Sequence, residues 1–299
     1  MPIKDLDLDL LPTLKKVDIR AKRRVLSRVL EGSWTAMMKG RGMEFAGFRQ
    51  YTFGDDASRI DWGATLRSKE TLIREFEEFK NVTVFMLLDV SETMLFSSVG
   101  KLKAEYGAEL LFNFSAAILD NGDSVGFAMF NDDVVAKIQP GMGKDVLYRM
   151  ANELQKPKNY GGGFSLKPAI RLLENFLHAR ALVILISDFI GMEKGWERYI
   201  KMIGQKHDLI AITLRDPRDR EMPALPAQVL VEDPLTHEKL YIDAKQYRKL
   251  YNESVKKEEI YLKSVFEKAK AGNIFMTTDS DTMVPLLSYF RKRSAILKG

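Results

Sequence analysis

Two nearly continuous apolar runs, residues 82–88 and 181–187, constrain the fold of this chain more than any other feature. The first reads VTVFMLL and the second ALVILIS. A strand that is apolar at almost every position is typical of the centre of a largely parallel sheet, where helices cover both faces. Each run is followed directly by an acidic residue, Asp89 and Asp188. Because the carboxyl ends of parallel strands lie at one edge of a sheet, we expect the two carboxylates to lie at the same edge.

Strand and helix patterns alternate through the rest of the chain. Further central strands are predicted at 125–130 and 208–214, two edge strands within 216–242, and a long charged helix at 245–271. Alternation of this kind predicts an α/β fold, a doubly wound, mainly parallel sheet flanked by helices. We place this domain at residues 81–299 and an N-terminal helical and irregular extension at residues 1–80.

The first 80 residues differ from the rest in charge. Between residues 14 and 49, ten Lys or Arg side chains stand against three acidic ones, a net charge of +7 in a chain whose formal charge is +5. Residues 6–31 have the apolar spacing of basic amphipathic helices, and residues 32–56 read as an irregular, Gly-rich stretch. A basic arm of this kind can contact nucleic acid, anionic lipid or an acidic protein surface, or form a solvated helix face.

Residues 40–80 lack a core of their own, so we expect them to pack against the main domain. This predicts that Phe48 and Trp62 are buried. We also expect the polar side chains of this segment to form a buried cluster that holds it to the sheet. The members of that group are Asp55, Asp56, Arg59, Asp61, Trp62 and Arg67.

Composition excludes several classes of site. The 299 residues include no Cys, which excludes disulfides, a thiolate nucleophile and a Cys-based zinc site. No apolar run approaches the roughly 18–20 residues that a spanning helix needs. The chain begins with acidic residues where a signal peptide would have basic ones. These features predict a cytoplasmic protein without a membrane span.

The residues after the first apolar run have the chemistry of a metal site. In an extended loop, alternate side chains point the same way, so Asp89, Ser91 and Thr93 present one carboxylate and two hydroxyls to one point. Oxygen donors of this type suit Mg²⁺, which keeps several waters in its shell. Asp188 would hold one of those waters from the neighbouring strand.

The pattern Asp89-x-Ser91-x-Thr93 resembles the D-x-S-x-S motif of the metal-ion-dependent adhesion site in von Willebrand factor A domains. Upstream, the segments 47–51, 54–56 and 59–62, with Arg67, resemble the signature of domain-of-unknown-function family fifty-eight, a bacterial family whose members accompany MoxR-type AAA ATPases.

The resemblance implies a non-enzymatic protein-binding or adaptor role. It implies Mg²⁺ or Mn²⁺ as the metal, and a MoxR-type AAA ATPase or its client as the partner. Phe164 stands where the adhesion site has a further Thr, and either the adjacent Ser165 substitutes for it or the loop 161–163 shifts the register. The implied metal ligands are Asp89, Ser91, Thr93, Ser165 and Asp188.

Three alternatives stay open at this point. The motif could be only a helix cap, since Asp, Ser and Thr favour that position. It could belong to a Mg²⁺-dependent phosphoryl-transfer enzyme of the haloacid-dehalogenase type, although Ser91 stands where that class has its general acid. The basic arm could bind nucleic acid, although no reading module or aromatic stacking platform accompanies it, which makes nucleic acid an unlikely partner.

Overall fold

The two apolar runs form adjacent strands at the centre of a six-stranded sheet. The computed structural model describes residues 6, 8, 44–77, 82–224, 228–233, 236, 238–280 and 283–298. Its main sheet has the strand order β10-β7-β6-β3-β4-β5. The strands are β3 (Thr83–Asp89), β4 (Ser124–Phe130), β5 (Val134–Gly141), β6 (Leu182–Ser187), β7 (Asp208–Arg215) and β10 (Gly272–Thr277). Only β5 runs antiparallel to its neighbour, so the predicted mainly parallel, doubly wound sheet is confirmed.

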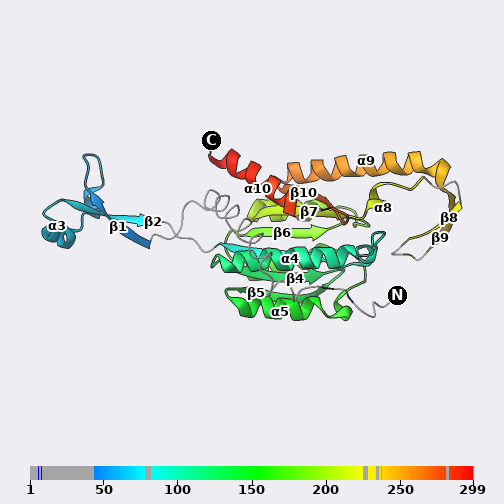
Figure 1. Ribbon diagram of the computed structural model, residues 1–299, viewed down its shortest axis with the longest axis horizontal. Helices are drawn as coiled ribbons and strands as arrows, with labels where there is room; N and C mark the ends of the chain where they lie inside the picture. The colour runs from blue at the N-terminus through cyan, green and yellow to red at the C-terminus, as the bar shows by residue number, and fades with distance from the viewer. Residues whose placement is uncertain are drawn as a thin grey trace.

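Helices cover both faces of this sheet (Figure 1). One face packs against α4 (Lys103–Asp120), α5 (Lys144–Leu154) and α10 (Met283–Lys298). The other packs against α6 (Lys167–Phe176), α7 (Glu197–Lys206) and α9 (Ala244–Lys268).

Alternate residues of β3 supply the two cores. Met86 and Leu88 belong to the first core, and Phe85 and Leu87 to the second. All four are fully buried, which explains why the run is apolar at successive positions. The four central strands predicted from the sequence therefore agree with the structure to within one residue at each end.

The two strands expected at an edge of the main sheet form a separate hairpin instead. β8 (Gln228–Glu232) and β9 (Lys239–Asp243) form a two-stranded antiparallel sheet of their own. Ile242 packs with Met222 and Ala244 in a small cluster beside the start of α9. That local cluster accounts for the hairpin's position away from the main sheet.

The N-terminal extension contains one strand that was not expected. β1 (Glu44–Gln50), which lies in the stretch predicted to be irregular, pairs antiparallel with β2 (Leu72–Glu77). Between them lie the 3-10 helix η1 (Ala57–Arg59) and α3 (Trp62–Ser68). The expected helices within 6–31 lie outside the described residues, except for Leu6 and Leu8. Leu8 is partly buried against the main core.

The predicted burial of Phe48 and Trp62 is wrong. Their side chains are 42% and 66% exposed. The expected buried polar cluster is also wrong, because none of the six residues is buried. Arg49 binds both oxygens of Asp55, at 2.8 and 2.7 Å. Asp61 caps α3 and accepts a 2.8 Å hydrogen bond from Arg74. Packing of residues 1–80 on the main domain stays a prediction.

Replacing Gly204 of α7 by alanine is expected to destabilise the protein by about 1–3 kcal/mol, although alanine is the better helix former. An added Cβ would lie against the backbone carbonyl oxygen of Ala269, which cannot move aside as a side chain can. Urea unfolding followed by circular dichroism measures the change. Gln205→Ala, at the next and exposed position of α7, is the control and should change stability by less than about 0.5 kcal/mol. A Gly204→Ala variant as stable as the wild type would contradict the close packing of α7 against the backbone of Ala269.

Candidate functional site

The candidate site begins at the carboxyl end of β3. Leu88 of β3 lies opposite Ile186 of β6, so Asp89 emerges beside Ser187 at the same edge of the sheet. The Ser187 hydroxyl donates a 2.6 Å hydrogen bond to Oδ2 of Asp89. The backbone N–H of Ser91 donates to Oδ1 of the same carboxylate at 2.9 Å. β3 has β4 on one side and β6 on the other, so this edge is the point where the winding of the sheet reverses, the usual ligand position in such folds.

A chain of hydroxyls connects this loop to the second acid. Thr93 Oγ1 donates to Oδ1 of Asp188 at 3.2 Å. Ser91 Oγ lies 3.2 Å from Thr93 Oγ1 and can donate to it. All of these side chains are essentially inaccessible to solvent. The structure therefore brings together Asp89, Ser91, Thr93 and Asp188, four of the five predicted residues.

These residues do more than cap a helix. Ser91 occupies the N-cap position of the 3-10 helix η2 (Glu92–Leu95), but its side chain makes no capping hydrogen bond. The long helix that follows, α4, has Leu102 at its N-cap. The hydroxyls of Ser91 and Thr93 instead join the contacts that lead to Asp188.

The turn that carries Asp188 has an unusual backbone. Phe189 has φ +53°, in the left-handed region that bulky residues rarely adopt. Its ring packs against those of Trp196 and Phe266, with centroids 6.0 and 5.2 Å away. Asp188 Oδ1 also accepts the backbone N–H of Ile190 at 2.9 Å. Aromatic packing therefore holds a strained turn that sets the direction of the Asp188 carboxylate.

A buried lysine that the sequence analysis missed completes the cluster. Lys103, the first residue of α4, has a side chain only 1% exposed. Its Nζ lies 2.7 Å from Oδ2 of Asp188 and 2.6 Å from Oδ2 of Asp219. The Phe96 ring lies beside the ammonium, 5.7 Å from Nζ to the centroid.

Asp219 belongs to the short helix α8 (Pro217–Arg220), which follows β7. Asp216 caps this helix and also accepts the backbone N–H of Ser98 at 2.8 Å. Asp216 lies at the same edge of the sheet as Asp89 and Asp188, but Arg215 separates it from the apolar run of β7. The rule that found those two acids therefore misses Asp216 by one residue.

Burial dominates the electrostatics of Asp89. Loss of solvation, followed by the nearby negative charge of Asp188, raises the pKa of Asp89 to about 7. Hydrogen bonds from Ser187 and Ser91 act in the opposite direction but only in part. Burial therefore opposes the ionised form of Asp89 when no cation is bound.

The loop that carries Ser165 lies next to the motif loop. Gly161 N–H donates to Val90 C=O at 2.8 Å, and Glu92 N–H donates to Gly162 C=O at 2.9 Å. The Ser165 hydroxyl, however, donates to Glu193 at 3.0 Å. Phe164 is buried, and its ring packs edge-on against that of Phe130. The place of Ser165 in a metal shell stays a prediction.

The chemistry of the donor set fits a hard divalent cation. Two carboxylates and two hydroxyls converge, and the ammonium of Lys103 already contacts one carboxylate. No group of three or more His, Asp or Glu side chains with metal-binding geometry occurs within the described residues. A site of this kind would depend on hydroxyls and waters for much of its shell.

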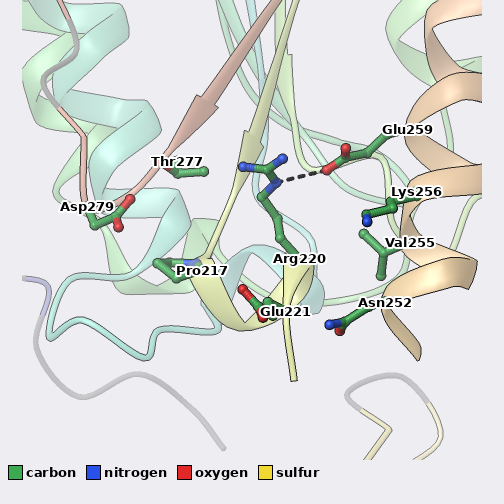
Figure 2. Close-up of a pocket in the computed structure, with 9 residues that line it drawn as sticks. All are labelled: Pro217, Arg220, Glu221, Asn252, Val255, Lys256, Glu259, Thr277 and Asp279. Carbon is green, nitrogen blue, oxygen red and sulfur yellow. Dashed lines mark hydrogen bonds and ion pairs between the residues drawn. The ribbon is translucent and has the colours of Figure 1, made fainter. Parts of the chain in front are cut away.

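A separate pocket of about 400 Å³ lies between α8 and α9 (Figure 2). Its lining includes Arg220 and Glu259, joined by a 2.8 Å ion pair. None of the five predicted site residues lines it. The pocket adjoins the helix that carries Asp219, and we assign it no ligand.

An uncharacterized protein of Mycobacterium tuberculosis is 25% identical over 231 residues, which cover 76% of this chain and 71% of that protein. An uncharacterized protein of Mycobacterium avium is 28% identical over 130 residues, 43% of this chain and 75% of that one. Among solved structures, the conserved hypothetical protein BatB of Bacteroides thetaiotaomicron matches at 17% identity with a TM-score of 0.45, over 72% of this chain and 99% of that one.

Within the described residues, no helix has both the length and the apolar character needed to cross a bilayer. Residues 47–261 match the model of the family described as "Protein of unknown function DUF58". That match covers most of the chain, including part of β1, all of β2, the candidate site and most of α9. The chain belongs to the DUF58 family of proteins of unknown function, as its motifs indicated.

Proposed function

We propose that this protein is a non-enzymatic binding or adaptor module that holds a partner's carboxylate through Mg²⁺ or Mn²⁺. The observation that carries the proposal is the buried set of oxygen donors at the edge where the sheet reverses its winding. Asp89, Ser91, Thr93 and Asp188 would hold the ion, with Ser165 as the fifth ligand. A cation with few charged ligands keeps open positions, and an acidic side chain of a partner can fill one. The von Willebrand factor A-like character of the motif supports the same role.

The phosphoryl-transfer alternative fits the residues less well. An enzyme of that type uses a carboxyl as general acid two residues after its nucleophilic Asp, and this chain has Ser91 there. A hydroxyl does not donate a proton near neutral pH as a tuned carboxyl does. Both oxygens of Asp89 also accept hydrogen bonds, from Ser187 and from Ser91.

The family resemblance supports a MoxR-type AAA ATPase, or its client, as the partner, and the cytoplasm as the place where they meet. The basic segment 14–49 would add a second contact that weakens as salt increases. In this view the metal site gives specificity for an acidic group, and the basic segment speeds the encounter.

Binding of a purified MoxR-type AAA ATPase from the same organism is expected to be at least about tenfold tighter in millimolar Mg²⁺ than in EDTA. The physical reason is positive coupling, because the metal and the partner's carboxylate complete one shell. Asp89→Ala should remove the Mg²⁺-dependent part and leave the circular dichroism spectrum unchanged. Calorimetry measures both affinities.

Asp120→Ala, which removes an exposed acid at the other end of α4, is the matched control and should behave as the wild type does. Equal affinity in EDTA and in Mg²⁺, with Asp89→Ala indistinguishable from the wild type, would contradict the proposal. Metal-independent binding to the ATPase would leave the adaptor role without its metal.

A further inference from the structure

Lys103 is the least expected charged group in the described part of the molecule. A lysine is almost never fully buried unless it is paired, because an ammonium loses much hydration energy inside a protein. Lys103 is among the largest fully buried side chains. Its single positive charge is shared between two carboxylates, those of Asp188 and Asp219, at nearly equal distances of 2.7 and 2.6 Å.

One of these two carboxylates is also a candidate metal ligand. Oδ1 of Asp188 accepts the Thr93 hydroxyl, and Oδ2 accepts Lys103. A divalent cation bound at this carboxylate would therefore meet a positive charge already in contact with it. Like charges this close, in a site from which water is excluded, repel strongly.

The second carboxylate provides a fixed alternative for the ammonium. Asp219 Oδ2 also accepts the backbone N–H of Asp216 at 2.9 Å, which ties it to the start of α8. The Tyr251 hydroxyl of α9 donates to the backbone carbonyls of Arg218 and Asp219. Asp219 is thus held in place by two elements, independently of the motif loop.

We propose that Lys103 is an internal competitor for the divalent cation, a positive charge that occupies Asp188 when the metal is absent and is retained by Asp219 when the metal binds. This inference rests on the proposed function and names how the same site is regulated. It explains how the buried carboxylate of Asp188 is paired with a positive charge without metal. It also sets the metal affinity low, so that the ion is held firmly only when a partner's carboxylate contributes a further negative charge.

The test is Mn²⁺ binding to the full chain. Binding is measured as the decrease in the electron paramagnetic resonance signal of free Mn²⁺. Lys103→Met removes the competing charge and keeps the volume of the side chain, so the Mn²⁺ affinity should rise at least about tenfold. Asp219→Asn leaves the ammonium with Asp188 alone, so the affinity should fall by about threefold or more. The opposite signs matter, because a merely structural role for Lys103 would weaken binding in both variants.

Lys101→Met is the matched control, since Lys101 lies two residues away and pairs with Glu109 near the surface. It should leave the affinity within about twofold of the wild type. If circular dichroism shows that Lys103→Met does not fold, Lys103→Gln, which also removes the charge, takes its place. The Mn²⁺ affinity of Asp219→Asn tests the proposal independently of both variants. If the wild type binds Mn²⁺ and the Lys103 variant binds it equally or more weakly, the proposed competition by Lys103 is overturned, but the metal site is not. No Mn²⁺ binding by the wild type or any variant would overturn the metal site itself.

Discussion

Asp89→Asn is expected to make the metal-free protein more stable at pH 8, by about 1–3 kcal/mol, and no more stable than the wild type at pH 5. The pKa of Asp89 is raised from its ordinary value of 3.8 to about 7, chiefly by burial. A group whose pKa is raised on folding contributes stability that is fully present below its unfolded pKa. That stability is lost as the pH rises through the folded value. The wild type should therefore lose stability between about pH 4 and pH 7, as Asp89 is forced to ionise inside the protein.

Asparagine has no such transition, since it stays neutral at every pH. The shift at Asp89 corresponds to at most about 4 kcal/mol, from which the loss of one well-placed acceptor subtracts about 1–2 kcal/mol. Urea unfolding in EDTA at the two pH values measures the difference between variant and wild type. Asp120→Asn, an exposed change, should differ from the wild type by less than about 0.5 kcal/mol at both.

Adding Mg²⁺ provides a second measurement, in which the wild type and not Asp89→Asn is expected to gain stability. A cation that binds only the folded protein stabilises it, and at pH 8 it would compensate for the ionised Asp89. Millimolar Mg²⁺ should therefore stabilise the wild type and leave Asp89→Asn almost unchanged, so that the advantage of the variant shrinks. A wild type whose stability does not fall between pH 4 and pH 7 relative to Asp89→Asn would contradict the burial of this charge.

The sheet and its edge were predictable because their signals are local and strong. Val84 to Leu88 are apolar at successive positions, which is rare outside the centre of a parallel sheet. Once two such strands are placed side by side, Asp89 and Asp188 must emerge at one edge. None of this needs knowledge of distant contacts. The hydroxyls of Ser91 and Thr93 do meet, but the extended loop expected between them is wrong, because Thr93 lies in the 3-10 helix η2.

Lys103 could not be found in this way, because lysine is normally a surface residue and its burial depends on partners far along the chain. Asp219, 116 residues later, lies in a segment whose charges read as an ordinary loop. One feature of the sequence did indicate that Lys103 is buried. Most of α4 after Lys103 is apolar on every side, so a lysine in its first turn has little solvent to face.

The burial predicted for residues of the N-terminal extension was wrong for a different reason. Trp62 and Phe48 were expected to be buried because residues 40–80 lack a core of their own, but a folded surface always keeps some apolar side chains. The polar residues around them resemble a buried network by composition. In the structure Asp61 satisfies the start of α3, and Arg49 and Asp55 pair with each other, so no core is required. Composition does not distinguish local capping from burial.

A double-mutant cycle on Lys103 and Asp188, in EDTA, is expected to give a coupling energy of at least about 2 kcal/mol. Lys103→Met alone should cost about 3–5 kcal/mol, because it leaves Asp188 buried without its cation. Asp188→Asn alone should cost less, since Lys103 keeps Asp219. The double variant removes both charges together, so its loss should be smaller than the sum of the single losses. Lys206→Met with Glu174→Gln, an exposed ion pair, is the matched control, and its coupling should stay below about 1 kcal/mol. Additive losses at Lys103 and Asp188 would mean that the ammonium is stabilised by Asp219 alone and does not occupy the metal-binding carboxylate.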